Sequence, residues 1–100
     1  MVIVFGIIEV DGGDRGRYLE EKASQATATR TEAGCVEYTF AADADDPARV
    51  RLVERWESMA DLEAHVATVR AAAAPMQPSV PSRMVSVEVF EARAVQPPWA

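Results

Sequence analysis

The N-terminal segment constrains the fold more than any other part of the chain, because it is apolar on both faces of an extended strand. Residues 2–10 read VIVFGIIEV, and Glu9 is the only charged side chain among them. Successive side chains of a strand point to opposite faces, so both faces of this segment need cover. The pattern therefore predicts a central strand of a sheet and not an edge strand with one wet face.

Two helices are expected between the strands. Residues 15–32 follow Asp14, a residue type that caps helices, and precede Gly34, which is typical of a helix end. Ser58 and Asp61 form a capping-box pattern at the start of a second apolar-periodic segment. Each helix would thus begin at a polar residue that satisfies free backbone amides.

Three further extended segments complete the pattern, at residues 35–42, 50–57 and 83–92. The order β-α-β-β-α-β is the ferredoxin-like split motif, an α+β fold with a four-stranded antiparallel sheet. We expect a domain over residues 1–93 and a C-terminal tail over 94–100. Both helices of such a fold cover one face, so the other apolar face of the first strand needs a partner. Two sheets packed face to face would supply it, which predicts a homodimer.

Charge and cysteine content narrow the function. The net charge is −6 at pH 7, and the ten basic residues form no cluster, so we expect no nucleic-acid partner. Cys35 is the only cysteine, which excludes an intrachain disulfide and favours a small buried hydrophobe. The N-terminal segment lacks a basic leader and the span of a membrane helix. We therefore expect no membrane partner and a cytoplasmic location.

Four short segments carry a family resemblance: EAGCVEY at 32–38, DDP at 45–47, VERWES at 53–58 and LEAH at 62–65. Together they resemble the antibiotic biosynthesis monooxygenase domain, from the first strand to Phe90. The resemblance implies a dimeric α+β barrel with a pocket between sheet and helices in each subunit. Members of the family include oxygenases that oxidise aromatic polyketides without flavin, haem or metal, haem-degrading enzymes, and many small proteins of undefined substrate.

The match to the pocket residues of the family is partial. Trp56 stands where the cofactor-free oxygenases have a pocket tryptophan, but Leu52 stands where they have an asparagine on the same strand face. Compared with the haem degraders, Gly6 replaces an asparagine, His65 replaces a tryptophan, and the iron-binding histidine falls near Pro75. The resemblance therefore disfavours haem degradation and implies no cofactor.

A few side chains carry candidate chemistry. His65 is the only histidine and the natural proton acceptor, or else a half-buried helix residue with a backbone or carboxylate partner. Trp56 is either core or a wall on which a flat aromatic substrate stacks. Glu54 shares its strand face, so it must be paired, hydrogen-bonded or protonated, in an ion pair, at a subunit contact or against substrate. Tyr18 and Tyr38 carry phenols that either reach a substrate oxygen or simply pack.

Small side chains indicate where a pocket would lie. Ala23 and Ala26 occupy the first helix where larger residues are expected, and Gly6 on the facing strand has no side chain. Because native interiors are close-packed, either the helix sits close to the sheet or a ligand fills the space bounded by these residues, Trp56 and His65. The missing side chain at Gly6 favours the ligand-filled pocket.

The sequence favours a cofactor-independent monooxygenase that oxidises a small aromatic or polyketide-like phenol or quinol to a quinone. No phosphate-binding loop, nucleotide fingerprint or metal-ligand spacing occurs, so we expect neither cofactor nor metal. Two alternatives remain open: a non-catalytic ligand-binding or stress-response dimer, and an isomerase or cyclase on the same fold. The predicted catalytic residues are His65 as base and Trp56 as wall, and the predicted substrate-binding residues are Gly6, Tyr18, Ala23, Ala26, Leu52 and Glu54.

Overall fold

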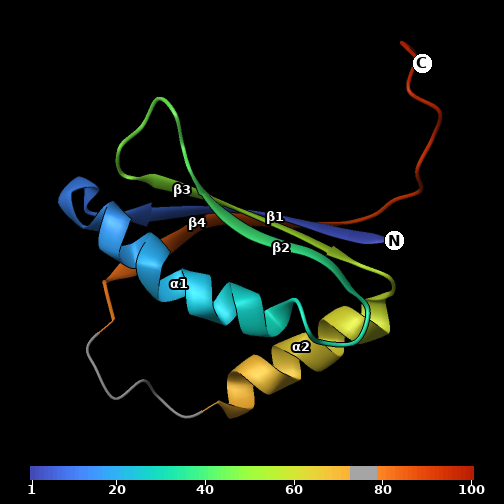
Figure 1. The fold of residues 1–100 in the computed structure, drawn as a ribbon, viewed down its shortest axis with the longest axis horizontal. Helices are drawn as coiled ribbons and strands as arrows, with labels where there is room; N and C mark the ends of the chain where they lie inside the picture. Colours follow the sequence, from blue (N-terminus) through green and yellow to red (C-terminus); the bar gives the residue numbers. More distant parts are fainter. Residues whose placement is uncertain (73–78) are drawn as a thin grey trace.

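One antiparallel sheet carries both helices on the same face (Figure 1). The computed structural model describes residues 1–72 and 79–100. The strands follow the order β2-β3-β1-β4, which confirms the ferredoxin-like α+β fold and the central place of the first strand. The elements are β1 (Val2–Val10), the 3-10 helix η1 (Gly12–Asp14), α1 (Arg15–Thr29), β2 (Cys35–Ala42), β3 (Arg49–Trp56), α2 (Met59–Ala71) and β4 (Ser82–Glu91).

The helix-covered face of the sheet holds the core. Period-two alternation predicts that Val50, Leu52, Glu54 and Trp56 of β3 share one face, and all four are buried. The side chains of Val50 and Trp56 are completely buried. Gly6 of β1 lies opposite Leu52 in the antiparallel ladder. The inward face of β3 thus places a tryptophan and a carboxylate beneath the helices.

The two ends of α1 differ from the sequence-based expectation. Asp14 occupies the N-cap position, but its side chain makes no capping hydrogen bond. Instead, the backbone amide of Gly13 donates to the Asp11 carboxylate at 2.9 Å, which caps η1 ahead of the helix. The helix ends at Thr29, earlier than predicted, and Gly34 forms the turn into β2 with φ of 77°. At its N-terminus, α1 is thus preceded by the 3-10 helix η1 and is not capped by Asp14. At its C-terminus, a turn of several residues separates the helix from Gly34.

The start of α2 follows the capping-box prediction in one of its two bonds. The amide of Asp61 donates to the Ser58 hydroxyl at 3.2 Å. The second bond runs from that hydroxyl to the Asp61 carboxylate at 2.9 Å, in place of a bond from the Ser58 backbone amide. A Cβ atom on Gly34 would overlap the Asp61 side chain. Glycine is therefore required at this position by close approach as well as by its positive φ.

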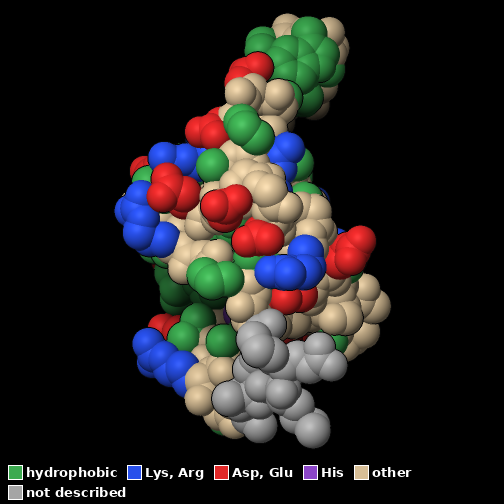
Figure 2. Space-filling view, turned by 90° about the vertical axis from the view of Figure 1, so that its left-hand side faces the viewer, with side chains coloured by type: hydrophobic (Ala, Val, Ile, Leu, Met, Phe, Trp, Pro, Cys, Tyr) green, Lys and Arg blue, Asp and Glu red, His purple; other side chains and the backbone are tan. Residues whose placement is uncertain are grey.

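The opposite face of the sheet and the whole of β4 are open. Every residue of β4 is exposed, and Phe5 and Phe90 meet edge to face on the helix-free face with ring centroids 6.0 Å apart. This is the face that the predicted homodimer would cover. Residues 92–100 continue from β4 and project from the body (Figures 1 and 2). Trp99 in this tail is 87% exposed. The predicted division between residues 93 and 94 stays a prediction.

The surface shows no dominant charge of either sign on the side seen in Figure 2, where acidic and basic side chains are interspersed. Within residues 1–72 and 79–100, no helix combines the length and apolarity that crossing a membrane requires.

Candidate active site

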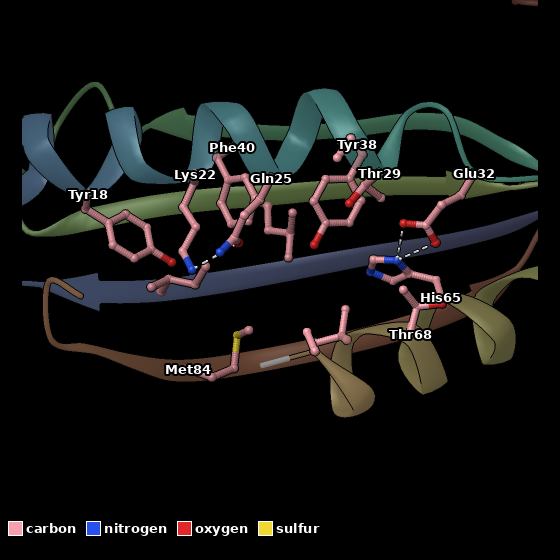
Figure 3. A pocket seen from close by; sticks show the side chains of 15 residues that line it. Tyr18, Lys22, Gln25, Thr29, Glu32, Tyr38, Phe40, His65, Thr68 and Met84 are labelled. Atoms are coloured by element: carbon pink, nitrogen blue, oxygen red, sulfur yellow. Dashed lines mark hydrogen bonds and ion pairs between the residues drawn. The ribbon is translucent and has the colours of Figure 1, made fainter. Parts of the chain in front are cut away.

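A pocket of about 600 Å³ lies between α1, α2 and the inner face of the sheet (Figure 3). One stripe of α1 lines it with Tyr18, Lys22, Gln25 and Thr29, at the i, i+4, i+7 and i+11 spacing of a single helix face. The pocket is therefore built along the length of α1. The sheet supplies an apolar floor of Ile8, Phe40, Leu52 and Met84.

His65 of α2 lies at one end of this pocket and is 5% exposed. Its Nδ1 atom is 3.0 and 3.2 Å from the two carboxylate oxygens of Glu32, which stands in the turn between α1 and β2. An ionised carboxylate only accepts, so Nδ1 carries the proton of this bond and Nε2 of a neutral ring keeps its lone pair. Figure 3 shows the second ring nitrogen turned away from Glu32, on the pocket side. A neutral imidazole held in this way can accept a proton at Nε2.

Two aromatic rings hold the imidazole in place. His65 stacks on Trp56 with ring centroids 4.9 Å apart and an interplanar angle of 30°. Tyr38 of β2 meets the imidazole edge-on at 5.3 Å. Behind the stack, the indole Nε1 of Trp56 donates to the Glu54 carboxylate at 3.0 Å. Two carboxylates, Glu32 and Glu54, thus flank the Trp56–His65 stack.

Burial shifts the acid–base properties of this cluster. Desolvation raises the pKa of Glu54 and outweighs the opposing effects of the Trp56 hydrogen bond and of His65. Desolvation also raises the pKa of the Tyr38 phenol, and the negative charges of Glu54 and Glu32 add to the effect. Tyr38 therefore stays protonated at neutral pH. Its side chain points into the pocket in Figure 3, where its hydroxyl can donate to an anionic oxygen.

Five of the predicted site residues gather at or beneath the pocket. His65, Tyr18 and Leu52 line it, whereas Trp56 and Glu54 do not. Trp56 is completely buried, so it contacts the imidazole and not the pocket space. Its place in the fold is that of a support for His65, in contrast to the expected wall for substrate.

The other three predicted residues lie elsewhere. Ala23 and Ala26 border a separate hollow of about 240 Å³ on another side of α1. Gly6 lies close under Leu52, where a Cβ atom would come within 3.3 Å of the Leu52 Cβ atom. The sequence predicted one cavity bounded by these small residues, Trp56 and His65. The structure instead places Ala23 and Ala26 at a different hollow from His65. Ala26 is only 3% exposed, so its small side chain is packed in the core.

Sequence reasoning did not select Glu32, Lys22 or Gln25. Lys22 and Gln25 share the helical stripe of Tyr18, and that spacing is readable in the sequence. Glu32 had no such signal, because it meets His65 across a separation of 33 residues.

The sequence also raises expectations for the single cysteine and for the metal-binding potential of the chain, and the structure bears on both. Cys35 is partly exposed and packs beside the Trp56 cluster, and burial raises the pKa of its thiol. In the described ranges, 1–72 and 79–100, no three His, Cys, Asp or Glu side chains group in a way that could hold a metal ion. Pro75, aligned with the iron-binding histidine of the haem degraders, lies outside the described residues.

The fold and the pocket define an α+β protein of the ferredoxin-like class with a buried histidine at one end of a pocket between helices and sheet. The family model described as antibiotic biosynthesis monooxygenase matches residues 1–77, and the chain belongs to this family. A search of curated proteins finds no match to this sequence.

Several solved structures share the fold at low sequence identity. A candidate antibiotic biosynthesis monooxygenase from Deinococcus radiodurans is 18% identical over 97% of both chains, with a TM-score of 0.75. A second candidate from Chloroflexus aurantiacus is 19% identical over 96% of both chains, with a TM-score of 0.73. The haem degrader MhuD from Mycobacterium tuberculosis, solved with two haems in its active site, is 19% identical. The match covers 97% of this chain and 100% of MhuD, with a TM-score of 0.70. At these identities the likeness establishes the fold alone.

Proposed function

We propose that this protein is a cofactor-independent monooxygenase that oxidises a small aromatic or polyketide-like phenol or quinol to a quinone. The observation that carries the proposal is the Glu32–His65 pair, which presents an imidazole nitrogen to a pocket with an apolar floor. Membership of the monooxygenase family supports it. We also propose that the active form is a homodimer, because the helix-free face exposes Phe5 and Phe90.

The proposed reaction uses dioxygen as co-substrate and balances without a cofactor. One phenol with a free para carbon and one O₂ give one quinone and one water. Nε2 of His65 removes the phenolic proton, and the electron-rich phenolate transfers an electron to O₂. A carbon–oxygen bond then forms at the para carbon. Loss of the ring proton and cleavage of the O–O bond release water. In a quinol the para carbon is occupied, so the carbon–oxygen bond forms at a free ortho carbon, and the same loss of water gives a hydroxyquinone.

The residues around His65 orient the substrate and the imidazole and shield the reacting atoms in part from water. Tyr38 donates a hydrogen bond to the phenolate oxygen, which it can do because burial keeps its own phenol protonated. Leu52 and Phe40 form the apolar surface under the aromatic ring. Trp56 and Glu54 act through His65, since the indole stacks on the imidazole and is itself held by the carboxylate.

Oxygen uptake with a panel of phenols and quinols tests the proposal. His65→Gln should lower kcat by about 10²- to 10⁴-fold, the usual contribution of a general base. Glu32→Gln should lower it less, because the imidazole remains but its tautomer is no longer set by a charge. Glu63→Gln, on the exposed side of α2, is the matched control and should leave kcat unchanged.

Other outcomes separate the alternatives. Turnover that persists without oxygen would identify an isomerase or cyclase, and ligand binding without any turnover would identify a binding protein. Oxygen uptake should survive treatment with a chelator. A tight Soret band on titration with haem would contradict the cofactor-free proposal.

A further inference from the structure

The pocket has two chemically different ends. His65 and Glu32 stand at one end, close to Tyr38, and Thr29 of α1 lies beside them (Figure 3). At the other end, Tyr18, Lys22 and Gln25 converge from the preceding turns of α1. Lys22 and Thr29 are about 10 Å apart along the helix axis, at about 1.5 Å per residue. A molecule that contacts both ends must be longer than a single benzene ring.

Lys22 brings a positive charge to the end remote from His65. It is the only lysine of the chain, and its Nζ lies 3.3 Å from the Gln25 side-chain oxygen and 5.3 Å from the centre of the Tyr18 ring. Every ion pair among the described residues uses an arginine or His65 as its cation. The chain has sixteen acidic residues, yet no carboxylate of the described residues lies within 4 Å of the Lys22 ammonium. Lys22 lines the pocket instead.

The charges of the lining also set an orientation. Among the described residues of the lining, Lys22 is the only basic one with a permanent charge, and Glu32 is the only acidic one. A carboxylate on a ligand would be repelled at the Glu32 end and attracted at the Lys22 end, where the Gln25 amide offers a further donor. Lys22 is a partly buried residue, and its ammonium gains a counter-ion in the same step.

We propose that the substrate is an elongated aromatic acid of more than one ring, bound with its carboxylate at Lys22 and its phenol at His65. The assignment of the reacting end rests on the proposed monooxygenase function. The carboxylate end rests on Lys22, Gln25 and the remote position of Glu32. The part of the ligand between its carboxylate and its phenol should be a planar aromatic ring system, because the floor of the pocket between the two ends is apolar.

Calorimetric binding of a matched ligand pair tests the proposal. The probes are 6-hydroxy-2-naphthoic acid and its uncharged carboxamide, which have the same ring system and differ by one charge. The wild-type protein should bind the acid at least about tenfold more tightly than the amide, as expected for a hydrogen-bonded charge pair. Lys22→Met should remove this preference by weakening the acid alone, and Lys22→Arg should retain most of it.

Arg17→Met is the matched control, because it removes one positive charge from the same helix at an exposed position outside the pocket lining. It should leave the preference for the acid unchanged. Three results would overturn the proposal: equal binding of acid and amide, an equal loss of both in Lys22→Met, or no binding of either at millimolar concentration. Oxygen uptake is measured separately. Charge-selective binding without turnover of any phenol would overturn the monooxygenase function and keep the carboxylate site.

Discussion

β3 and β4 pair antiparallel with opposite edges of β1, yet their burial is opposite. Leu52 of β3 and Val87 of β4 both lie across from Gly6, and they are 6% and 55% exposed, respectively. Both strands carry apolar side chains on the helix side of the sheet. The difference arises because, among residues 1–72 and 79–100, α1 packs mainly against β2 and α2 against β3, and neither helix packs as extensively on β4. The burial of a strand is therefore decided by what lies over it and not by its own alternation.

β4 is more apolar than is usual for a solvent-exposed edge strand. Met84, Val87 and Val89 on its helix side and Phe90 on the other side are each more than 40% exposed. Natural edge strands are usually shortened, charged or covered, because an open apolar edge invites association. The proposed homodimer would cover Phe90 on the helix-free face, whereas Met84, Val87 and Val89 face the helix side.

The largest expected effect is on β3. Leu52→Ala should lower the free energy of unfolding by about 2–5 kcal/mol, because it leaves a cavity in the core. The matched change Val87→Ala should cost at most about 0.5 kcal/mol in a monomer, as for other exposed positions. Urea denaturation at several protein concentrations measures both. A large, concentration-dependent cost of Val87→Ala would show that a second copy covers β4, and equal costs at high dilution would contradict the comparison.

The next effect concerns association. Phe90→Glu places a charge on the helix-free face beside Phe5 and should weaken the homodimer by about 2 kcal/mol, roughly thirtyfold in the dissociation constant. Light scattering after size exclusion should show a shift from dimer to monomer at micromolar concentration. Ser24→Glu on the exposed side of α1 is the control and should stay dimeric. A wild-type protein that is a monomer under these conditions would refute the homodimer.

A smaller effect should appear in the dependence of stability on pH. Burial raises the folded-state pKa of Glu54 above its ordinary value of 4.5, so the folded protein binds this proton more tightly than the unfolded chain. Stability should therefore fall as pH rises from about 4.5 through the raised pKa and then level off. Glu54→Gln keeps an acceptor for Trp56 and should remove this fall. It should be more stable than wild type at neutral pH and similar near pH 4.

Denaturant midpoints of both proteins across this range measure the effect. The same loss of stability in Glu54→Gln would assign the pH dependence to other groups. Glu37→Gln, at a partly exposed carboxylate on the other face of the sheet, is a suitable control.

The smallest effect is expected in the tail. Deleting residues 94–100, which include the exposed Trp99, should change the free energy of unfolding by no more than about 0.5 kcal/mol. The remaining fluorescence should come from Trp56 alone and should report a buried indole. A larger loss of stability would place the tail within the folded unit and contradict the division between residues 93 and 94.

Local patterns in the sequence were sufficient to predict the elements and the faces of the strands. The bounds of β2 were predicted as 35–42, and the strand indeed runs from Cys35 to Ala42. Alternation also placed Glu54 and Trp56 on the inward face of β3. These features depend on hydrogen bonding and side-chain direction along a short stretch of chain, so neighbouring residues contain the information.

The candidate site could be predicted only in part, because its contacts join distant segments. Histidine chemistry selected His65, but only packing brings the turn after α1 against α2, where Glu32 meets the imidazole. The same packing places Trp56 behind His65 and divides the expected cavity, because α1 buries Ala26 and turns Lys22 toward the pocket. Composition and periodicity determine which face of a helix is apolar. The rotation and depth at which that face packs on the sheet depend on the close-packed fit of all the layers, and that fit exists only in the tertiary structure.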